Sequence, residues 1–138
     1  MMNLNQISID LDSRTAWVES GATLGEMYYA ISQASSSLSF PAGCCPAVGI
    51  GGHFSCGGYG LMTRKYGLSA ENVIDALLVS RTGHVFRLRS NGRRCVRSGQ
   101  FEVVVEVFRV FVYAGKIQLV PIPAIITAFK FSRNDMKN

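Results

Sequence analysis

The 138-residue sequence lacks any apolar run of the roughly 18 residues that a membrane-spanning helix needs. Its first residues, MMNLNQISIDLD, show no basic start followed by an apolar stretch, so no signal peptide is predicted. Charged residues are few, at 17%, whereas apolar residues reach 48%, which excludes a polar disordered chain. Composition also excludes collagen, a coiled coil and a disulfide-dense scaffold. The sequence is therefore that of one globular domain, or of a piece of one.

The four cysteines lack the paired spacing of a zinc site. Cys44 and Cys45 are adjacent, so their side chains are expected to point apart, and Cys56 and Cys95 stand alone. His53 lies near Cys56, but no second pair completes a tetrahedron. No metal site is therefore predicted, and the cysteine count settles neither the disulfide pairing nor the redox compartment.

The formal charge of +5 is unevenly distributed. Residues 86–113 hold six arginines against two glutamates, and the rest of the chain is almost neutral. A basic loop of this kind can contact phosphate, so a small nucleic-acid-binding module is one alternative. Because the excess comes from one stretch, the sequence does not favour a nucleic-acid partner.

Apolar spacing predicts one helix and several strands. Thr23 and Glu26 form a capping-box pattern at the start of a helix over 23–35, and apolar residues follow at helical spacing, as in a core-facing stripe. Short strands are predicted at 6–10, 16–20, 72–80, 84–88, 101–113, 116–120 and 124–131. A turn at residues 82–83 joins two of them.

Residues 40–67 are loop-like and carry eight of the fourteen glycines. Glycine permits positive φ and close approach of another body, and successive amides in such turns can bind an anion such as a diphosphate. A helix starting near Gly52 would add a partial positive charge. The spacing fits neither a Rossmann fingerprint nor a P-loop. A tight structural turn is the competing interpretation.

The segment PAGCCPAVGIGGHFSCGGYG, followed by TRKYGLSAENVIDALLV, closely resembles plant berberine bridge enzyme-like proteins, which are FAD-linked oxidases. The resemblance begins at TAWVESGATLGEMYYAISQ and resumes at KIQLVPIP, so it covers roughly 6–85 and 113–131. It implies an α+β fold of the vanillyl-alcohol oxidase type, with strands flanked by a few helices around the glycine-rich loop. It also implies that the chain corresponds to the middle of the FAD-binding domain. The segment with a second glycine loop and a flavin-linked histidine, and the substrate domain, would then lie outside it.

In that family, loop amides hold the FAD diphosphate and a cysteine before a proline is bonded through sulfur to the flavin ring. Cys45 occupies that position, although its neighbour Cys44 leaves the identity of the linked sulfur open. His53 belongs to the cofactor loop by resemblance, and a packed, hydrogen-bonded histidine is the alternative. Cys56 replaces a usual glycine, so a side chain there would crowd the turn. The predicted cofactor-contacting residues are Cys45, Pro46, Ala47, Gly49, Gly51, Gly52, His53, Ser55, Gly57, Gly58, Tyr59 and Gly60. No catalytic residue is assigned within the chain.

Residues 86–112 depart from the family pattern. Glycine codons read one base later give the Val-Val-Val-Glu found at 103–106, so we hypothesise a frame-shifted stretch, which sequencing of the transcript would test. Three functions follow: an oxidase that transfers hydride from a small organic substrate to FAD and then to oxygen, an inactive remnant with a partial FAD-binding fold, or the basic module. The substrate and the oligomeric state stay open. Relatives are usually secreted, but no export signal is predicted here.

Overall fold

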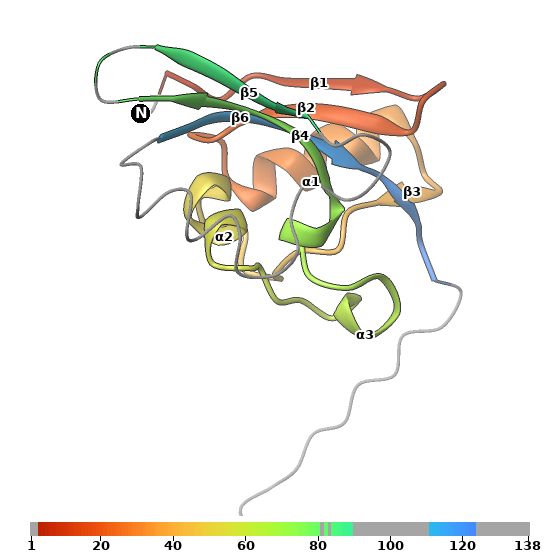
Figure 1. The fold of residues 1–138 in the computed structure, drawn as a ribbon. Coiled ribbons are helices and arrows are strands. Elements are labelled where there is room, and N and C mark those ends of the chain that lie inside the picture. Colours follow the sequence, from red (N-terminus) through yellow and green to blue (C-terminus); the bar gives the residue numbers. More distant parts are fainter. Residues whose placement is uncertain (1–2, 81, 83, 90–110, 124–138) are drawn as a thin grey trace, which may run out of the picture.

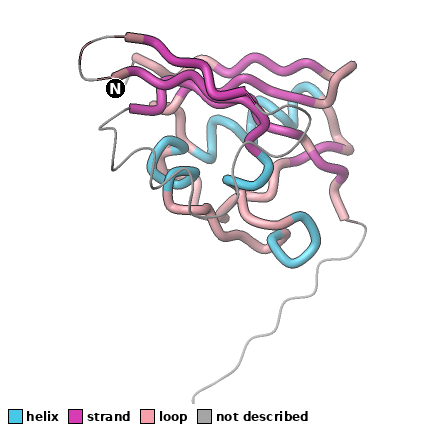
Figure 2. The backbone as a smooth tube through the Cα atoms, viewed as in Figure 1, coloured by secondary structure: helices cyan, strands magenta, loops and turns pink. Residues whose placement is uncertain are grey.

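A computed structural model describes residues 3–80, 82, 84–89 and 111–123. A five-stranded sheet forms one layer, and the helices lie together on one side of it (Figures 1 and 2). The strands are β1 (Ile7–Asp10), β2 (Thr15–Glu19), β4 (Val73–Val79), β5 (Val85–Arg89) and β6 (Phe111–Gln118). Their order is β1-β2-β6-β4-β5, and every neighbouring pair is antiparallel. This mixed architecture is the α+β fold that was predicted.

Helix α1 (Leu24–Ala34) begins as the sequence predicts. The Thr23 side chain accepts from the Glu26 amide and the Glu26 carboxylate accepts from the Thr23 amide, which completes the capping box. The Thr23 amide and the Thr23 hydroxyl both donate to the Glu26 carboxylate, and these two bonds lower the pKa of that carboxyl. Leu24, Met27 and Ile31 are buried, so the apolar stripe packs on the sheet.

The glycine-rich segment contains more regular structure than the sequence indicates. Helix α2 (Ile50–Ser55) begins at Gly49, and α3 (Thr63–Tyr66) and the 3-10 turn η1 (Ala70–Asn72) follow. A two-stranded sheet joins β3 (Leu38–Ser39) to β7 (Val120–Pro121). These pieces are too short for periodicity to reveal them, because each spans at most two turns or two residues.

Strand β6 corrects one prediction. The sequence suggests separate strands at 101–113 and 116–120, but β6 continues through residues 114 and 115. Gly115 breaks the apolar pattern, yet it pairs with Val18 on one side and Ala76 on the other, so neighbouring strands hold it in the sheet. Most of the predicted strand 101–113 and all of 124–131 lie outside the described residues, as does most of the anomalous stretch 86–112.

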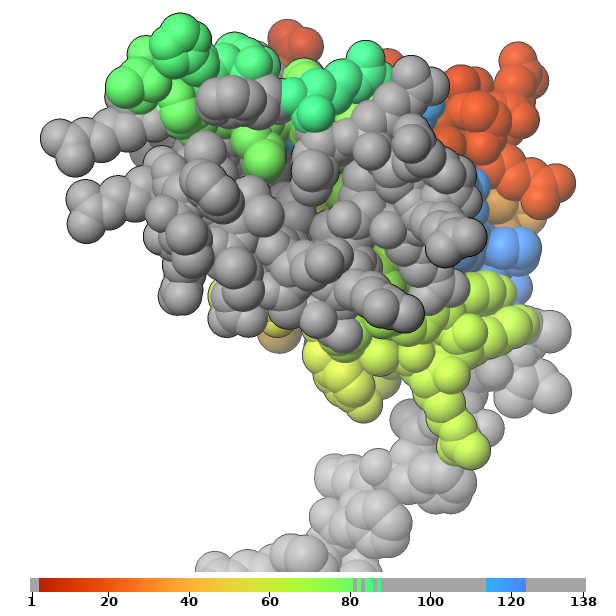
Figure 3. All heavy atoms as spheres, viewed as in Figure 1, coloured from red at the N-terminus to blue at the C-terminus, as the bar shows by residue number. Residues whose placement is uncertain are grey.

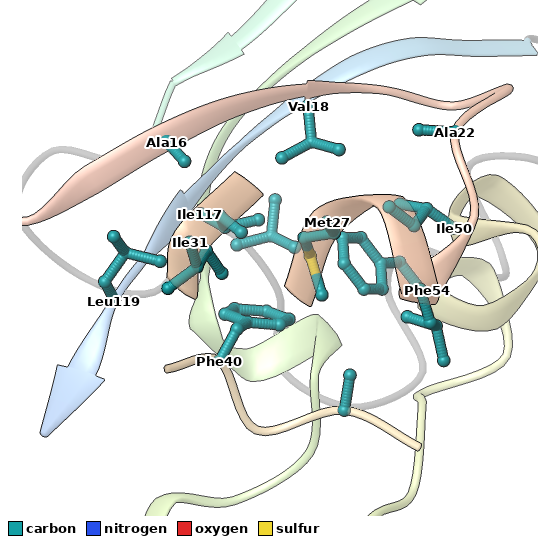
Figure 4. Packing of buried hydrophobic residues seen from close by; sticks show 13 residues of the cluster. Ala16, Val18, Ala22, Met27, Ile31, Phe40, Ile50, Phe54, Ile117 and Leu119 are labelled. Atoms are coloured by element: carbon teal, nitrogen blue, oxygen red, sulfur yellow. The ribbon is translucent and has the colours of Figure 1, made fainter. Parts of the chain in front are cut away.

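The core lies between the sheet and the helices (Figure 4). It joins residues of β2, β6, α1 and α2 to Phe40, whose ring lies 5.2 Å from the ring of Phe54. None of the helices in the described ranges is long and apolar enough to span a membrane. The segment around residue 60 lies at the lower edge of the described surface, opposite the β4–β5 hairpin (Figure 3).

Candidate cofactor site

The residues from Gly43 to Gly60 form two linked parts, a turn carrying the cysteines and a folded glycine region. The turn starts at Cys45, whose carbonyl accepts from the Val48 amide at 3.3 Å, and Pro46 occupies its second position. Proline is favoured there because its ring fixes φ near the value that the turn needs. Pro46, Ala47 and Val48 are all exposed. Residues 45–48 therefore form a short turn at the surface, in which proline restricts the backbone.

The turn is fastened to the start of α1. The Val48 carbonyl accepts from the Leu24 amide and the Pro46 carbonyl accepts from the Gly25 amide, both at 2.9 Å. A side chain at Gly25 would lie 2.9 Å from Pro46 Cβ, so only glycine permits this approach. The turn supplies acceptors to helix amides that would otherwise lack partners. It is consequently held by secondary structure rather than by its own contacts.

Gly43 is fastened on the other side. Its amide donates to His53 Nε2 at 3.0 Å, and its carbonyl accepts from the Tyr28 hydroxyl at 2.8 Å. Because a backbone amide can only donate, His53 Nε2 is unprotonated in this bond. Burial lowers the pKa of His53, which favours the neutral ring, and burial raises the pKa of Tyr28 to about 12, which keeps the hydroxyl proton.

Cys44 and Cys45 lie between these two attachments. Both are free cysteines and both are exposed. A surface hollow of about 350 Å³ lies beside them, lined by Tyr28, Phe40, Cys44, Leu61, Met62 and Ile122, among others. Cys44 lines this hollow and Cys45 does not. The two thiols are thus accessible in different surroundings.

The first group of glycines, at residues 49–52, has two members with exposed backbone. Gly49 and Gly52 are exposed, and a Cβ added at either would meet no atom of the described residues within 4 Å. The Gly52 amide donates no hydrogen bond to any residue that the structure describes. Gly51 differs, because its amide donates to the Ser20 carbonyl and a side chain would lie 2.9 Å from that oxygen. Residues 49–52 therefore combine one anchored position with two that a ligand can approach.

The second group of glycines, at residues 57–60, packs against other parts of the chain. Gly57 and Gly58 have φ of 89° and 74°, which side chains rarely adopt. Gly58 and Gly60 are buried, and a Cβ at Gly60 would overlap the Ala42 carbonyl. The Gly60 amide donates to Thr63 Oγ1. Packing thus explains these glycines, and their predicted contact with a cofactor stays a prediction.

The remaining predicted positions are placed around this arrangement. Ser55 donates its hydroxyl to the Gly51 carbonyl at 2.7 Å, and Tyr59 is 76% exposed. Cys56 ends α2 with φ of −97° and an exposed side chain, so the crowding expected at this position does not occur. No group of three potential metal ligands gathers among the described residues.

The sequence did not single out Ser69. Its hydroxyl is fully buried and contacts the carbonyls of Pro41 and Gly58, at 2.8 and 3.0 Å. It thereby joins the loop before the cysteines to the second glycine group. A lone serine in the motif GLSAEN gives no signal for such a role, because its partners lie far away in the chain.

Comparison with known proteins explains this geometry. Residues 1–89 match the model of a family described as an FAD binding domain. The chain belongs to this FAD binding domain family. Reticuline oxidase from Eschscholzia californica is 50% identical over 137 residues, and berberine bridge enzyme-like D-1 from Nicotiana tabacum is 46% identical over 140 residues. The alignments cover 97% and 99% of this chain but 24% of each relative, so the chain spans about a quarter of their length.

Solved structures of the family have the same fold. Berberine bridge enzyme from Eschscholzia californica superposes with a TM-score of 0.74 at 50% identity, and BBE-like 28 from Arabidopsis thaliana superposes with 0.74 at 43% identity. Each superposition covers 89% of this chain, and it covers 24% and 25% of the two structures. The chain therefore has the fold of the corresponding part of berberine bridge enzyme-like structures, as the resemblance of its motifs predicts.

Proposed function

We propose that this chain supplies the cysteine turn and the open glycines of a covalent FAD site in an oxidase acting on a small organic substrate. One observation carries the proposal. An exposed cysteine, Cys45, begins a turn that two hydrogen bonds fasten to α1, and that turn leads directly into Gly49 and Gly52, whose surroundings are open among the described residues. Placement of a nucleophile beside an approachable backbone is what a tethered dinucleotide requires.

The residues present fit such a group. A phosphate oxygen accepts hydrogen bonds from main-chain amides, and the Gly52 amide, which has no partner among the described residues, is a suitable donor. Absence of side chains at Gly49 and Gly52 lets the diphosphate come close. Neutral His53 and protonated Tyr28 do not touch the cofactor in this proposal. They fix Gly43 and so limit where the following cysteines can move.

The chemistry that FAD would supply when bound is hydride transfer from a substrate carbon, followed by reduction of dioxygen. The role of Cys45 is attachment. Cys45 would hold the flavin through a carbon–sulfur bond: the thiol hydrogen and one ring hydrogen would be removed, and dioxygen would take up both as hydrogen peroxide. The thiolate is the reactive form of the cysteine. The substrate itself would be bound by parts of the protein that this chain does not contain.

The test compares cysteine variants after incubation with FAD in air. We expect the full chain to remain yellow after acid precipitation, because a thioether survives acid. Cys45→Ser should release all flavin into the supernatant. Cys56→Ser is the matched control, since Cys56 is also free and exposed but lies at the other end of α2.

Each result leads to a different conclusion. If Cys44→Ser abolishes attachment and Cys45→Ser does not, the tether is the other sulfur of the pair. Flavin that binds reversibly to every variant contradicts the covalent link but keeps the dinucleotide site. Colourless protein that also fails to bind added FAD favours the inactive remnant.

A further inference from the structure

Two cysteines, Cys44 and Cys45, stand next to each other at the proposed attachment point of the flavin. One thiol is sufficient for a tether, yet Cys44 and Cys45 are both free and exposed. We propose that Cys44 and Cys45 form a vicinal dithiol that hydrogen peroxide converts reversibly into a disulfide, which blocks attachment of FAD at Cys45. The link to FAD rests on the proposed function, whereas formation of the disulfide does not.

The backbone around the pair permits local rearrangement between fixed ends. Gly43 is held at both its amide and its carbonyl, and the Pro46 carbonyl is held by α1. Between them, the amides of Cys44 and Cys45 donate no hydrogen bond within the described part of the chain. The Cys45 carbonyl makes a single long bond, at 3.3 Å. The peptide joining the two cysteines can therefore reorient without breaking the attachments on either side.

The geometry of neighbouring residues makes this disulfide easy to reduce. Consecutive Cα atoms are about 3.8 Å apart across a trans peptide, whereas disulfides usually join Cα atoms about 4.4–6.8 Å apart. All described peptide bonds here are trans. A bond between the two sulfurs is consequently strained, and strained, exposed disulfides are the labile and regulatory ones. The pair is suited to a reversible change rather than to structural cross-linking.

The chemistry balances with one peroxide. A thiolate attacks peroxide and becomes a sulfenic acid, and the neighbouring thiol then displaces its hydroxyl group. Both S–H bonds and the peroxide O–O bond are broken, one S–S bond forms, and two waters are released. Hydrogen peroxide is also the product of dioxygen reduction in the proposed oxidase. Accumulated product would thus prevent further chains from acquiring their cofactor.

Mass spectrometry of the full chain without flavin tests the disulfide directly. After treatment with dilute hydrogen peroxide, we expect the monomer to lose the mass of two hydrogens, and peptide mapping to assign the bond to Cys44 and Cys45. Dithiothreitol should restore the original mass. Cys56→Ser should behave in the same way, whereas Cys44→Ser should show no internal bond involving Cys45.

Phenylarsine oxide gives a second readout, because one arsenic binds two thiols, with loss of water, when the backbone between them lets the sulfurs approach each other. We expect one arsenic per chain, displaced by a dithiol, in the full chain and in Cys56→Ser but not in Cys44→Ser. Bonds from Cys45 to Cys56, to Cys95 or to a second chain would overturn the proposal. So would sulfinic acid at Cys45 with no disulfide.

The consequence for the cofactor is measured separately. Protein oxidised at the pair should acquire acid-stable flavin only in proportion to its reduced fraction, and dithiothreitol should restore attachment. Full attachment to oxidised protein would contradict the block. If reduced protein acquires no flavin but the disulfide forms, the proposed function fails and the dithiol stands.

Discussion

The two glycine groups, residues 49–52 and 57–60, are similar in sequence and differ in surroundings. Gly49 and Gly52 have open space where a side chain would be, whereas Gly58 and Gly60 are pressed against Ser69 and Ala42. The first group keeps a surface approachable, and the second lets two backbone segments meet. Identical residues therefore leave the backbone approachable in one place and close the fold in the other.

The largest expected effect is from Gly60→Ala. Its Cβ would overlap the Ala42 carbonyl, which is backbone and cannot rotate away. We expect a loss of about 3 kcal/mol in the free energy of unfolding, the upper part of the usual overpacking range. Urea unfolding followed by the fluorescence of Trp17, the only tryptophan, measures it. Stability equal to that of the unaltered chain would mean that the second group is not close-packed.

Ser69→Ala should destabilise the same region less. It removes a buried hydroxyl that contacts the Pro41 and Gly58 carbonyls without creating an overlap. We expect a cost of about 1–2 kcal/mol, because a typical hydrogen bond contributes about 1 kcal/mol and the acceptors stay buried. Thermal unfolding monitored by circular dichroism checks this. The comparison would be weakened if Ser69→Ala cost more than Gly60→Ala.

His53 follows the first group, bonds to Gly43 and makes stability depend on pH. Burial lowers the pKa of His53 in the fold below the value of about 6.5 expected when unfolded, so the unfolded chain binds the proton more readily. The contribution of His53 is complete above pH 6.5 and is lost as the pH falls toward its folded pKa. Protonated His53 also cannot accept from the Gly43 amide. Urea unfolding across pH 5–8 should show this decline in the unaltered chain and a smaller one in His53→Gln.

Gly52→Ala should have the smallest effect on folding and a separate effect on the cofactor. Its helical position and open surroundings predict a gain of about 0.5–1 kcal/mol in stability, since alanine loses less entropy than glycine. Its methyl group would stand where the diphosphate is proposed to lie, so we expect FAD binding to weaken about tenfold, or about 1.4 kcal/mol. Isothermal titration measures the affinity. Unchanged affinity would place the diphosphate elsewhere.

The elements of the fold that depend on a local sequence pattern were predictable. The capping box at Thr23 and the apolar stripe of α1 depend on residues three or four apart, and β2 and β4 follow apolar runs. A helix near Gly52 was considered without bounds and is α2, whereas α3 was missed, because one or two turns leave no period to read. The continuous β6 was divided because Gly115 owes its strand conformation to its neighbours in the sheet.

The sequence by itself determined the family, the helix start and the position of a cysteine before a proline, because each is written in residues close together in the chain. Only the tertiary structure decided which glycines are open, that His53 and Tyr28 fasten Gly43, and that Ser69 bridges two distant segments. These are contacts between residues far apart in sequence. Their existence depends on how the sheet and helices pack, and no local pattern encodes that.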